Sequence, residues 1–181
     1  MIHYITPYST ENNIGKAYNE AINCIPDDED WIVLRDGDTM FLTPNWGKVI
    51  EENLKLHGEE YALLGAKTNR IGVYHHKVEG MFDRMDIRDH YHMALNLETV
   101  SRNKIQRVGF DIAGFFMAFQ KKTWSAVGGF DENTAVFDRI FTRKVRQLNG
   151  KVGVMEGLYL FHCYRIWSEN PENEVSHLYL E

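Results

Sequence analysis

Short apolar runs bounded by polar residues recur along the chain, and runs of this length are typical of buried β-strands. They occupy residues 2–6, 31–34, 61–66, 112–119, 151–156 and 158–164. The run Trp31-Ile32-Val33-Leu34 has no polar alternation, so both of its faces are expected to be covered. This pattern favours strands inside the central sheet of an α/β protein.

Between the first two runs, apolar residues recur with the period of an amphipathic helix. They are Ile14, Ala17, Tyr18, Ala21, Ile22 and Ile25, with Asn12 or Asn13 as the N-cap and Pro26 after the last turn. A second helix is expected to begin at Thr43-Pro44, with Thr43 as its N-cap. Further helices are predicted at about 88–100, 121–127 and 138–148.

The order strand–helix–strand–helix–strand over residues 2–66 implies parallel strands joined by right-handed crossovers. We therefore expect an α/β fold with a central, mostly parallel sheet. A chain of 181 residues fits a single domain that spans 1–181. Within it, residues 67–109 show no clear periodicity and are interpreted as a long loop or lid, whereas residues 168–181 read as a polar tail.

Composition narrows the functional class. The formal net charge of −6 argues against a protein that binds nucleic acid through its phosphate backbone. The two cysteines provide neither a disulfide framework nor a zinc motif. Neither a signal peptide nor an apolar run near the ~20 residues of a membrane span is visible, so a reducing, cytoplasmic setting is expected. The histidines in residues 75–92 lack helical ligand spacing and are expected to be structural or solvent-exposed.

The candidate chemistry begins directly after the central apolar run, at Asp36-Gly37-Asp38. Open α/β sheets bind ligands beyond the carboxyl ends of their strands. Residues i and i+2 of an extended chain point the same way, so both carboxylates can face one site. Hard divalent cations such as Mg²⁺ and Mn²⁺ prefer such oxygen ligands. The alternative is a simple turn, in which Asp-Gly pairs are common.

Three sequence pieces together resemble a known family. In chain order they are the apolar strand that ends in Asp36-Gly37-Asp38; Gly114–Phe119 with Lys121, Lys122 and Gly128-Gly129-Phe130-Asp131-Glu132; and Phe137-Asp138 with Arg143, Gly150 and His162. The combination is similar to the nucleotide-sugar-dependent glycosyltransferases of the GT-A fold, most of all to the family-two group. The resemblance covers about residues 2–165 and implies a Rossmann-like three-layer sandwich.

The resemblance also implies residue roles. It implies a divalent metal, Mn²⁺ or Mg²⁺, held by Asp38 and His162 with Asp36 in or near the metal shell, and Asp138 as the general base of an inverting enzyme. Donor contacts with a UDP- or GDP-sugar are expected from Thr6, Pro7, Tyr8, Asn19, Asp36, Asp38 and, through phosphate, Arg165. Trp124 and Asp131 are candidates for binding a carbohydrate or other hydroxyl acceptor, with 67–109 as a lid on that side.

Simpler interpretations remain open at this point. The simpler interpretation of His162 is a strand histidine satisfied by hydrogen bonds, that of Asp138 is a helix N-terminal acid favoured by the helix dipole, and that of Trp124 is a core residue. A nucleotidyltransferase or a non-catalytic nucleotide- or sugar-binding module are the rival functions. Against the former, Pro7-Tyr8-Ser9-Thr10 is not the Gly-rich basic loop that such enzymes often carry after their first strand.

Overall fold

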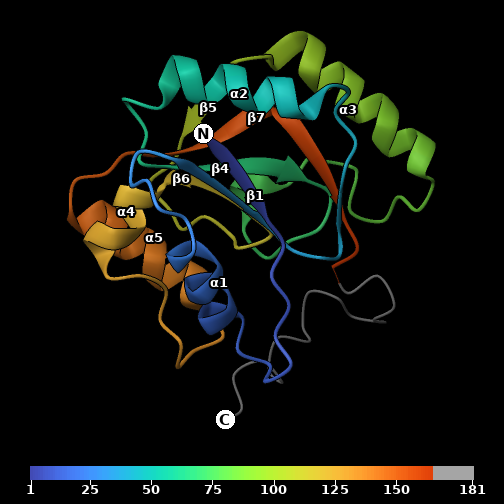
Figure 1. Cartoon of the computed structure of the whole chain (residues 1–181). Helices are drawn as coiled ribbons and strands as arrows, with labels where there is room; N and C mark the ends of the chain where they lie inside the picture. The colour runs from blue at the N-terminus through green and yellow to red at the C-terminus, as the bar shows by residue number, and fades with distance from the viewer. Residues whose placement is uncertain (165–181) are drawn as a thin grey trace.

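The protein is an α/β domain with one mixed sheet between two layers of helices. Its computed structural model describes residues 1–164, so Arg165 and the tail 168–181 lie outside the described residues. The strands are β1 (Ile2–Ile5), β2 (Trp31–Arg35), β3 (Thr39–Phe41), β4 (Leu63–Thr68), β5 (Ile105–Arg107), β6 (Phe116–Gln120) and β7 (Val152–His162). The helices are α1 (Ile14–Asn23), α2 (Trp46–His57), α3 (Ile87–Ser101), α4 (Lys121–Val127) and α5 (Phe137–Gln147), with a short 3₁₀ turn η1 (Tyr74–His76). Helices α2 and α3 cover one face, and α1, α4 and α5 cover the other (Figure 1).

The sheet has the strand order β1-β2-β6-β4-β7-β3, and β5 pairs with β7 beside this path. Two pairings are parallel, β1–β2 and β4–β7, whereas β6 runs antiparallel to both β2 and β4. β3 and β5 also run antiparallel to β7. The predicted mostly parallel sheet is therefore wrong. An unbroken apolar run indicates that both faces of a strand are buried, but it does not indicate the direction of the strand. β6 lies between β2 and β4 and runs antiparallel to both.

Strand β7 is one continuous strand where two were predicted. Its pairing with β4 shifts between Ala66 and Lys67, because Ala66 pairs with Met155 whereas Lys67 pairs with Tyr159. The bulge lets one long strand pair with β5 near its start and with β3 at its end. β3 and β5 were not predicted, since three-residue strands are too short to show a period of two.

The predicted helices are all present, with small shifts at their ends. Asn13 is the N-cap of α1, and its side chain accepts a hydrogen bond from the backbone N–H of Lys16. The start of α2 differs, because Asn45 is the N-cap residue rather than Thr43. The Thr43 hydroxyl instead accepts a hydrogen bond from the backbone N–H of Tyr159 at 2.8 Å, which ties the loop before α2 to β7.

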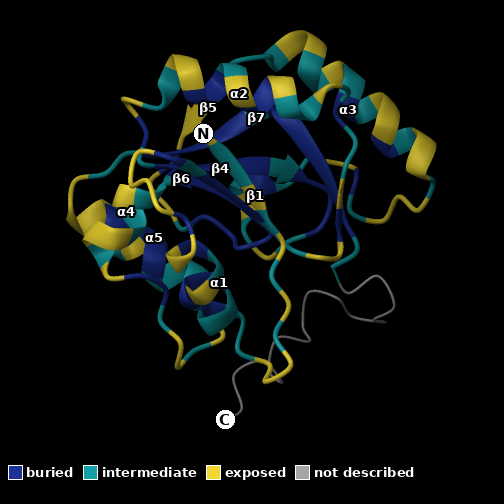
Figure 2. Ribbon diagram, viewed as in Figure 1, coloured by how far each residue is buried: buried dark blue, intermediate teal, exposed yellow. Residues whose placement is uncertain are grey.

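The protein has two apolar cores, one on each face of the sheet (Figure 2), and successive residues of β2 point alternately into one and the other. Ile32 and Leu34 pack with α1 and α5, whereas Val33 packs with α2. Burial of each large apolar side chain contributes roughly 1.5–3 kcal/mol to folding. The two cores therefore hold the carboxyl end of β2, where the aspartates begin, from both sides.

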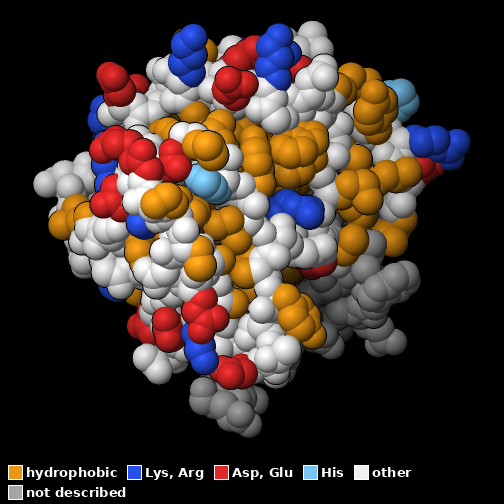
Figure 3. All heavy atoms as spheres, in the orientation of Figure 1, with side chains coloured by type: hydrophobic (Ala, Val, Ile, Leu, Met, Phe, Trp, Pro, Cys, Tyr) orange, Lys and Arg blue, Asp and Glu red, His pale blue; other side chains and the backbone are white. Residues whose placement is uncertain are grey.

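An aromatic cluster joins β1, β3 and α2. The rings of Phe41 and Trp46 stack with centroids 4.1 Å apart, and Tyr4 meets Trp46 edge-on at 5.2 Å. Apolar side chains gather between β1 and α2 on the face shown in Figure 3. The cluster anchors the short strand β3, which follows the two aspartates.

Residues 67–109 contain more regular structure than their sequence suggested. The segment holds the end of β4, η1, the 15-residue helix α3 and β5. His90 is buried, and its Nδ1 lies 2.7 Å from the Tyr159 hydroxyl; His76 is buried and pairs with the carbonyl of Ala66. These two histidines are structural, as expected. Movement of the segment as a lid stays a prediction. Within residues 1–164, no helix is both long and apolar enough for a membrane span.

We expect Gly15→Ala to destabilise the fold although Gly15 lies in α1, where alanine is normally the better residue by about 0.5–1 kcal/mol. A Cβ at Gly15 would lie 2.7 Å from the backbone oxygen of Asp131, which cannot rotate away. The expected loss is ~1–3 kcal/mol, the range for overpacking, measured by urea unfolding.

The matched control is Gly72→Ala, because a Cβ there meets no atom within 4 Å among the described residues. Equal stability of Gly15→Ala and the parent protein would contradict the close contact between α1 and the loop that carries Asp131.

Candidate metal and donor site

The two aspartates lie on a tight turn between β2 and β3. The backbone N–H of Asp36 donates to the carbonyl of Phe115 at 3.0 Å, which extends the pairing of β2 with β6. The Asp36 carbonyl in turn accepts hydrogen bonds from the backbone N–H (3.3 Å) and the hydroxyl (2.7 Å) of Thr39. The turn therefore fixes both carboxylates at the edge of the sheet and is not a loose surface loop.

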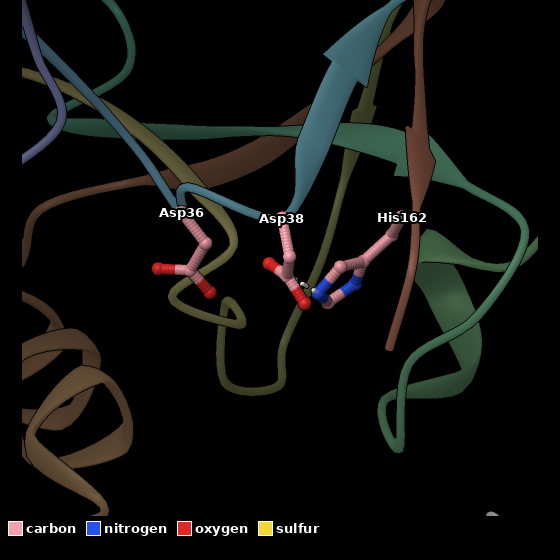
Figure 4. Close-up of side chains that lie close together, drawn as sticks. All are labelled: Asp36, Asp38 and His162. Atoms are coloured by element: carbon pink, nitrogen blue, oxygen red, sulfur yellow. Dashed lines mark ion pairs between the residues drawn. The ribbon is translucent and has the colours of Figure 1, made fainter. Parts of the chain in front are cut away.

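His162 approaches the turn from the end of β7, where it pairs with Thr39 of β3 (Figure 4). Its backbone N–H donates to the Asn69 side chain, and its Nδ1 lies 2.8 Å from the Arg70 carbonyl. A carbonyl can only accept, so Nδ1 carries the proton and Nε2 presents a lone pair when the ring is neutral. Nε2 lies 3.3 Å from Asp38 Oδ1.

One ligand atom from each of Asp36, Asp38 and His162 lies within 4.8 Å of the other two. Two carboxylate oxygens and one imidazole nitrogen make a suitable donor set for a divalent cation. His162 is buried, Asp36 is half-buried and Asp38 is exposed, so the group is open to solvent on one side. A ligating histidine regularly donates the N–H of its other ring nitrogen to a backbone carbonyl, as His162 does to Arg70. The residues fit a metal ion of the Mn²⁺ or Mg²⁺ type.

The two carboxylates differ in electrostatic environment. Burial raises the pKa of Asp36 above its usual value, with a smaller contribution from the neighbouring charge of Asp38. Burial also acts to raise the pKa of Asp38, but the pKa is lowered, because a protonated His162 ring would donate to Asp38 through Nε2 and carry a positive charge beside it. The Tyr18 hydroxyl donates to Asp36 Oδ1 at 3.0 Å, and burial raises the pKa of Tyr18. Tyr18 therefore stays protonated and orients Asp36.

Asp138 opens α5 close to this group. Its Oδ2 accepts from the backbone N–H of Gly114 at 2.8 Å and its Oδ1 from that of Arg139 at 2.7 Å. Burial raises the pKa of Asp138, and the charge of Asp36 raises it further. The expected lowering by the helix N-terminus is thus outweighed by desolvation. The Asp36 charge acts on Asp138, so the two carboxylates belong to one electrostatic environment.

Of the expected donor contacts, the loop after β1 lies beside the aspartate turn. Thr6 Cγ2 lies 3.9 Å from the position of a Cβ at Gly37, so Thr6 flanks the turn. Pro7 is half-buried, whereas Tyr8 is 87% exposed.

Asn19 and Trp124 belong to a hydrogen-bond network that joins α1 to α4 and to the loop after α4. Asn19 Oδ1 accepts from Trp124 Nε1 and the Phe130 N–H, and Asn19 Nδ2 donates to the Phe130 carbonyl and Glu132. The amide therefore has no unused donor or acceptor for a nucleotide. Trp124 packs against the apolar core, and Asp131 Oδ1 accepts from the Asn133 N–H. Their acceptor roles stay predictions.

Tyr18 and Asn69 support the site but were not singled out from the sequence as site residues. Tyr18 belongs to the apolar stripe of α1, and nothing in that stripe marks its hydroxyl as a partner of Asp36. Asn69 follows the carboxyl end of β4, where ligand-binding residues of α/β sheets gather. That position could have identified Asn69 from the sequence. It was missed because residues 67–109 were interpreted as one long loop, so the end of β4 was not located.

No protein-family model matches this chain, and no curated protein matches it. The functional interpretation therefore depends on the geometry of the site and on the sequence resemblance.

We predict that Asn69→Ala weakens Mn²⁺ binding about 10–100-fold, the range for losing an outer partner of a metal ligand. Asn69 accepts from the backbone N–H of His162 and donates to its backbone carbonyl, so the variant acts on the site by loosening the backbone position of this ligand. Calorimetric titration with Mn²⁺ measures the effect.

Asn96→Ala, on the exposed side of α3, is the control and leaves the Mn²⁺ affinity unchanged. If the folded Asn69→Ala protein binds Mn²⁺ as tightly as the parent, Asn69 does not orient a metal ligand.

Proposed function

We propose that the protein is a metal-dependent glycosyltransferase that moves a sugar from a nucleoside-diphosphate sugar to an acceptor hydroxyl. The observation that carries the proposal is the convergence of Asp36, Asp38 and His162 at the carboxyl end of β2. The resemblance to glycosyltransferases of the GT-A fold supports it. In this proposal the mixed sheet and its two helical layers are the Rossmann-like frame of that fold.

The three ligands would hold Mn²⁺ or Mg²⁺, which stabilises the negative charge of a departing nucleoside diphosphate as a Lewis acid. The chain itself supplies orientation. Tyr18 positions Asp36, and the Arg70 carbonyl positions His162. In this proposal the loop of Thr6, Pro7 and Tyr8, which flanks the aspartate turn through Thr6, contacts the nucleoside of a UDP- or GDP-sugar. A reducing cytoplasmic setting is part of the proposal.

Asp138 is the proposed general base. Its two backbone hydrogen bonds fix the carboxylate, and each oxygen keeps a second lone pair that can accept a proton from an acceptor hydroxyl. A raised pKa makes the carboxylate a stronger base, and general-base help is typically worth ~10²–10⁴ in rate. The sugar would then be transferred with inversion.

The test is incubation with a panel of nucleotide sugars, with and without Mn²⁺, followed by product analysis. Metal-dependent release of nucleoside diphosphate together with a glycosylated acceptor supports transfer. Pyrophosphate formed from a nucleoside triphosphate would indicate a nucleotidyltransferase instead. Binding of nucleotide sugar without any turnover would indicate a non-catalytic module.

Asp138→Asn is predicted to lower the transfer rate by at least ~10²-fold while donor binding survives. An amide has one acceptor oxygen, whereas Asp138 accepts from two backbone N–H groups, so a moderate loss of stability accompanies the change. Rates are therefore compared well below the melting temperature of the variant.

The pH profile separates a base from a structural role. Because burial raises the pKa of Asp138, the parent enzyme is expected to lose kcat/KM as the pH falls through that raised value. If Asp138→Asn transfers sugar at the parent rate and the acid side of its pH profile is unchanged, Asp138 is not the base. Its role would then be structural, as the acceptor of the Gly114 N–H.

A further inference from the structure

A second concave site lies beside α5, outside the candidate metal site. It is a groove of about 710 Å³ whose walls are η1, β5, the loop 108–111 and α5. An adjoining cavity of about 480 Å³ shares four of its lining residues, Arg107, Val108, Gly109 and Arg146. The two cavities thus form an extended groove, and none of the three candidate metal ligands lines it.

Basic side chains dominate this groove. Arg139, Arg143 and Arg146 follow the helical spacing i, i+4 and i+7, so they share one side of α5. Arg107 faces them from β5, and Asp111 is the one acidic residue on the lining of the larger cavity. Four arginines against one aspartate make a local positive site on a chain whose net charge is −6.

Most of this positive charge has no ion-pair partner among residues 1–164. Arg143 pairs with Asp111 at 3.1 Å, but within residues 1–164 the side chains of Arg107 and Arg146 form no ion pair, and both residues are exposed. Guanidinium groups bind carboxylate and phosphate through paired hydrogen bonds. The groove is therefore built to receive negative charge.

Two aromatic rings lie in the same groove. Tyr74 is 84% exposed and Phe110 is 73% exposed, and Phe110 stacks on His75 with centroids 6.3 Å apart. Exposed aromatic faces next to arginines suit a ligand that combines flat apolar surface with anionic groups. The ring face of a sugar supplies the first, and a carboxylate or phosphate substituent the second.

We propose that this groove binds an anionic saccharide, one that bears carboxylate or phosphate groups along an extended chain. The arginine stripe starts at Arg139, directly after Asp138, and reaches Arg146 about 10 Å further along the helix axis. An acidic oligosaccharide along the stripe would extend toward Asp138. That this saccharide is the acceptor rests on the proposed transferase function, whereas the binding itself does not.

The experiment measures binding of tetragalacturonate by calorimetry at low salt, without metal or nucleotide. Maltotetraose is the neutral comparison, and maltotetraose with a phosphate monoester distinguishes phosphate from carboxylate. The acidic tetramer is expected to bind, to weaken as salt screens the charges, and to lose at least about 10-fold in affinity in Arg107→Gln/Arg146→Gln. The neutral tetramer is not expected to bind.

Lys48→Gln/Lys55→Gln on α2 is the matched control, because it removes the same two charges from exposed positions on the opposite layer of the fold. Equal binding of neutral and acidic tetramers, or unchanged affinity in the arginine variant, would overturn the proposal. Tighter binding of a single-stranded RNA octamer through the same arginines would overturn the saccharide assignment.

The outcome is separable from that of the proposed function. Groove-dependent binding without any sugar transfer would uphold the groove and refute the transferase. Transfer to neutral acceptors with the same KM in the parent and the arginine variant would uphold the transferase and refute the groove as its acceptor site.

Discussion

The pairing of Thr39 with His162 is the constraint on which the candidate site depends. It joins the short strand β3 to the end of β7 and places the aspartate turn beside the histidine. The backbone N–H of Cys163 donates to the Asp38 carbonyl at 2.9 Å and extends the same ladder. Without this pairing, nothing would hold His162 beside Asp38, which lies more than 120 positions earlier in the chain.

Strands β4 and β6 hold the end of β7 and the aspartate turn in the positions that this pairing needs. β7 pairs in parallel with β4 on both sides of the bulge opposite Ala66 and Lys67, and beyond the bulge it also pairs with β3. The Phe115 ring, just before β6, stacks on His162 at 5.4 Å, and the Phe115 carbonyl holds Asp36. A single segment thus contacts both sides of the site. The mixed sheet is therefore directly involved in forming the site, because β6 must run between β2 and β4 for Phe115 to lie there.

The sequence could predict the parts of this structure that have a local physical signature. The helical period of α1, the unbroken apolar run of β2 and the aspartates at its end are visible without coordinates. The direction of each strand, and the continuity of β7 as one long strand, depend on pairing between distant residues. The prediction of a mostly parallel sheet was therefore wrong. Asp36, Asp38 and His162, which the resemblance grouped as metal ligands, lie near one another, and their binding of a metal stays a prediction. The hydrogen bonds that occupy the whole Asn19 amide depend on residues more than 100 positions away.

The electrostatics of the site follow from the same packing. Burial raises the pKa of both Asp36 and Asp138. A cation bound by Asp36, Asp38 and His162 would reduce the repulsion between the carboxylates that the fold brings close together. The most direct test is pulsed electron paramagnetic resonance of Mn²⁺ added to protein with ¹⁵N-labelled histidine. A metal site formed by Asp36, Asp38 and His162 predicts one directly coordinated histidine nitrogen, absent in His162→Gln, and loss of the bound signal in Asp38→Ala. Bound Mn²⁺ with no nitrogen coupling, or with a coupling that survives His162→Gln, would show that His162 is not a metal ligand and would contradict the proposed site.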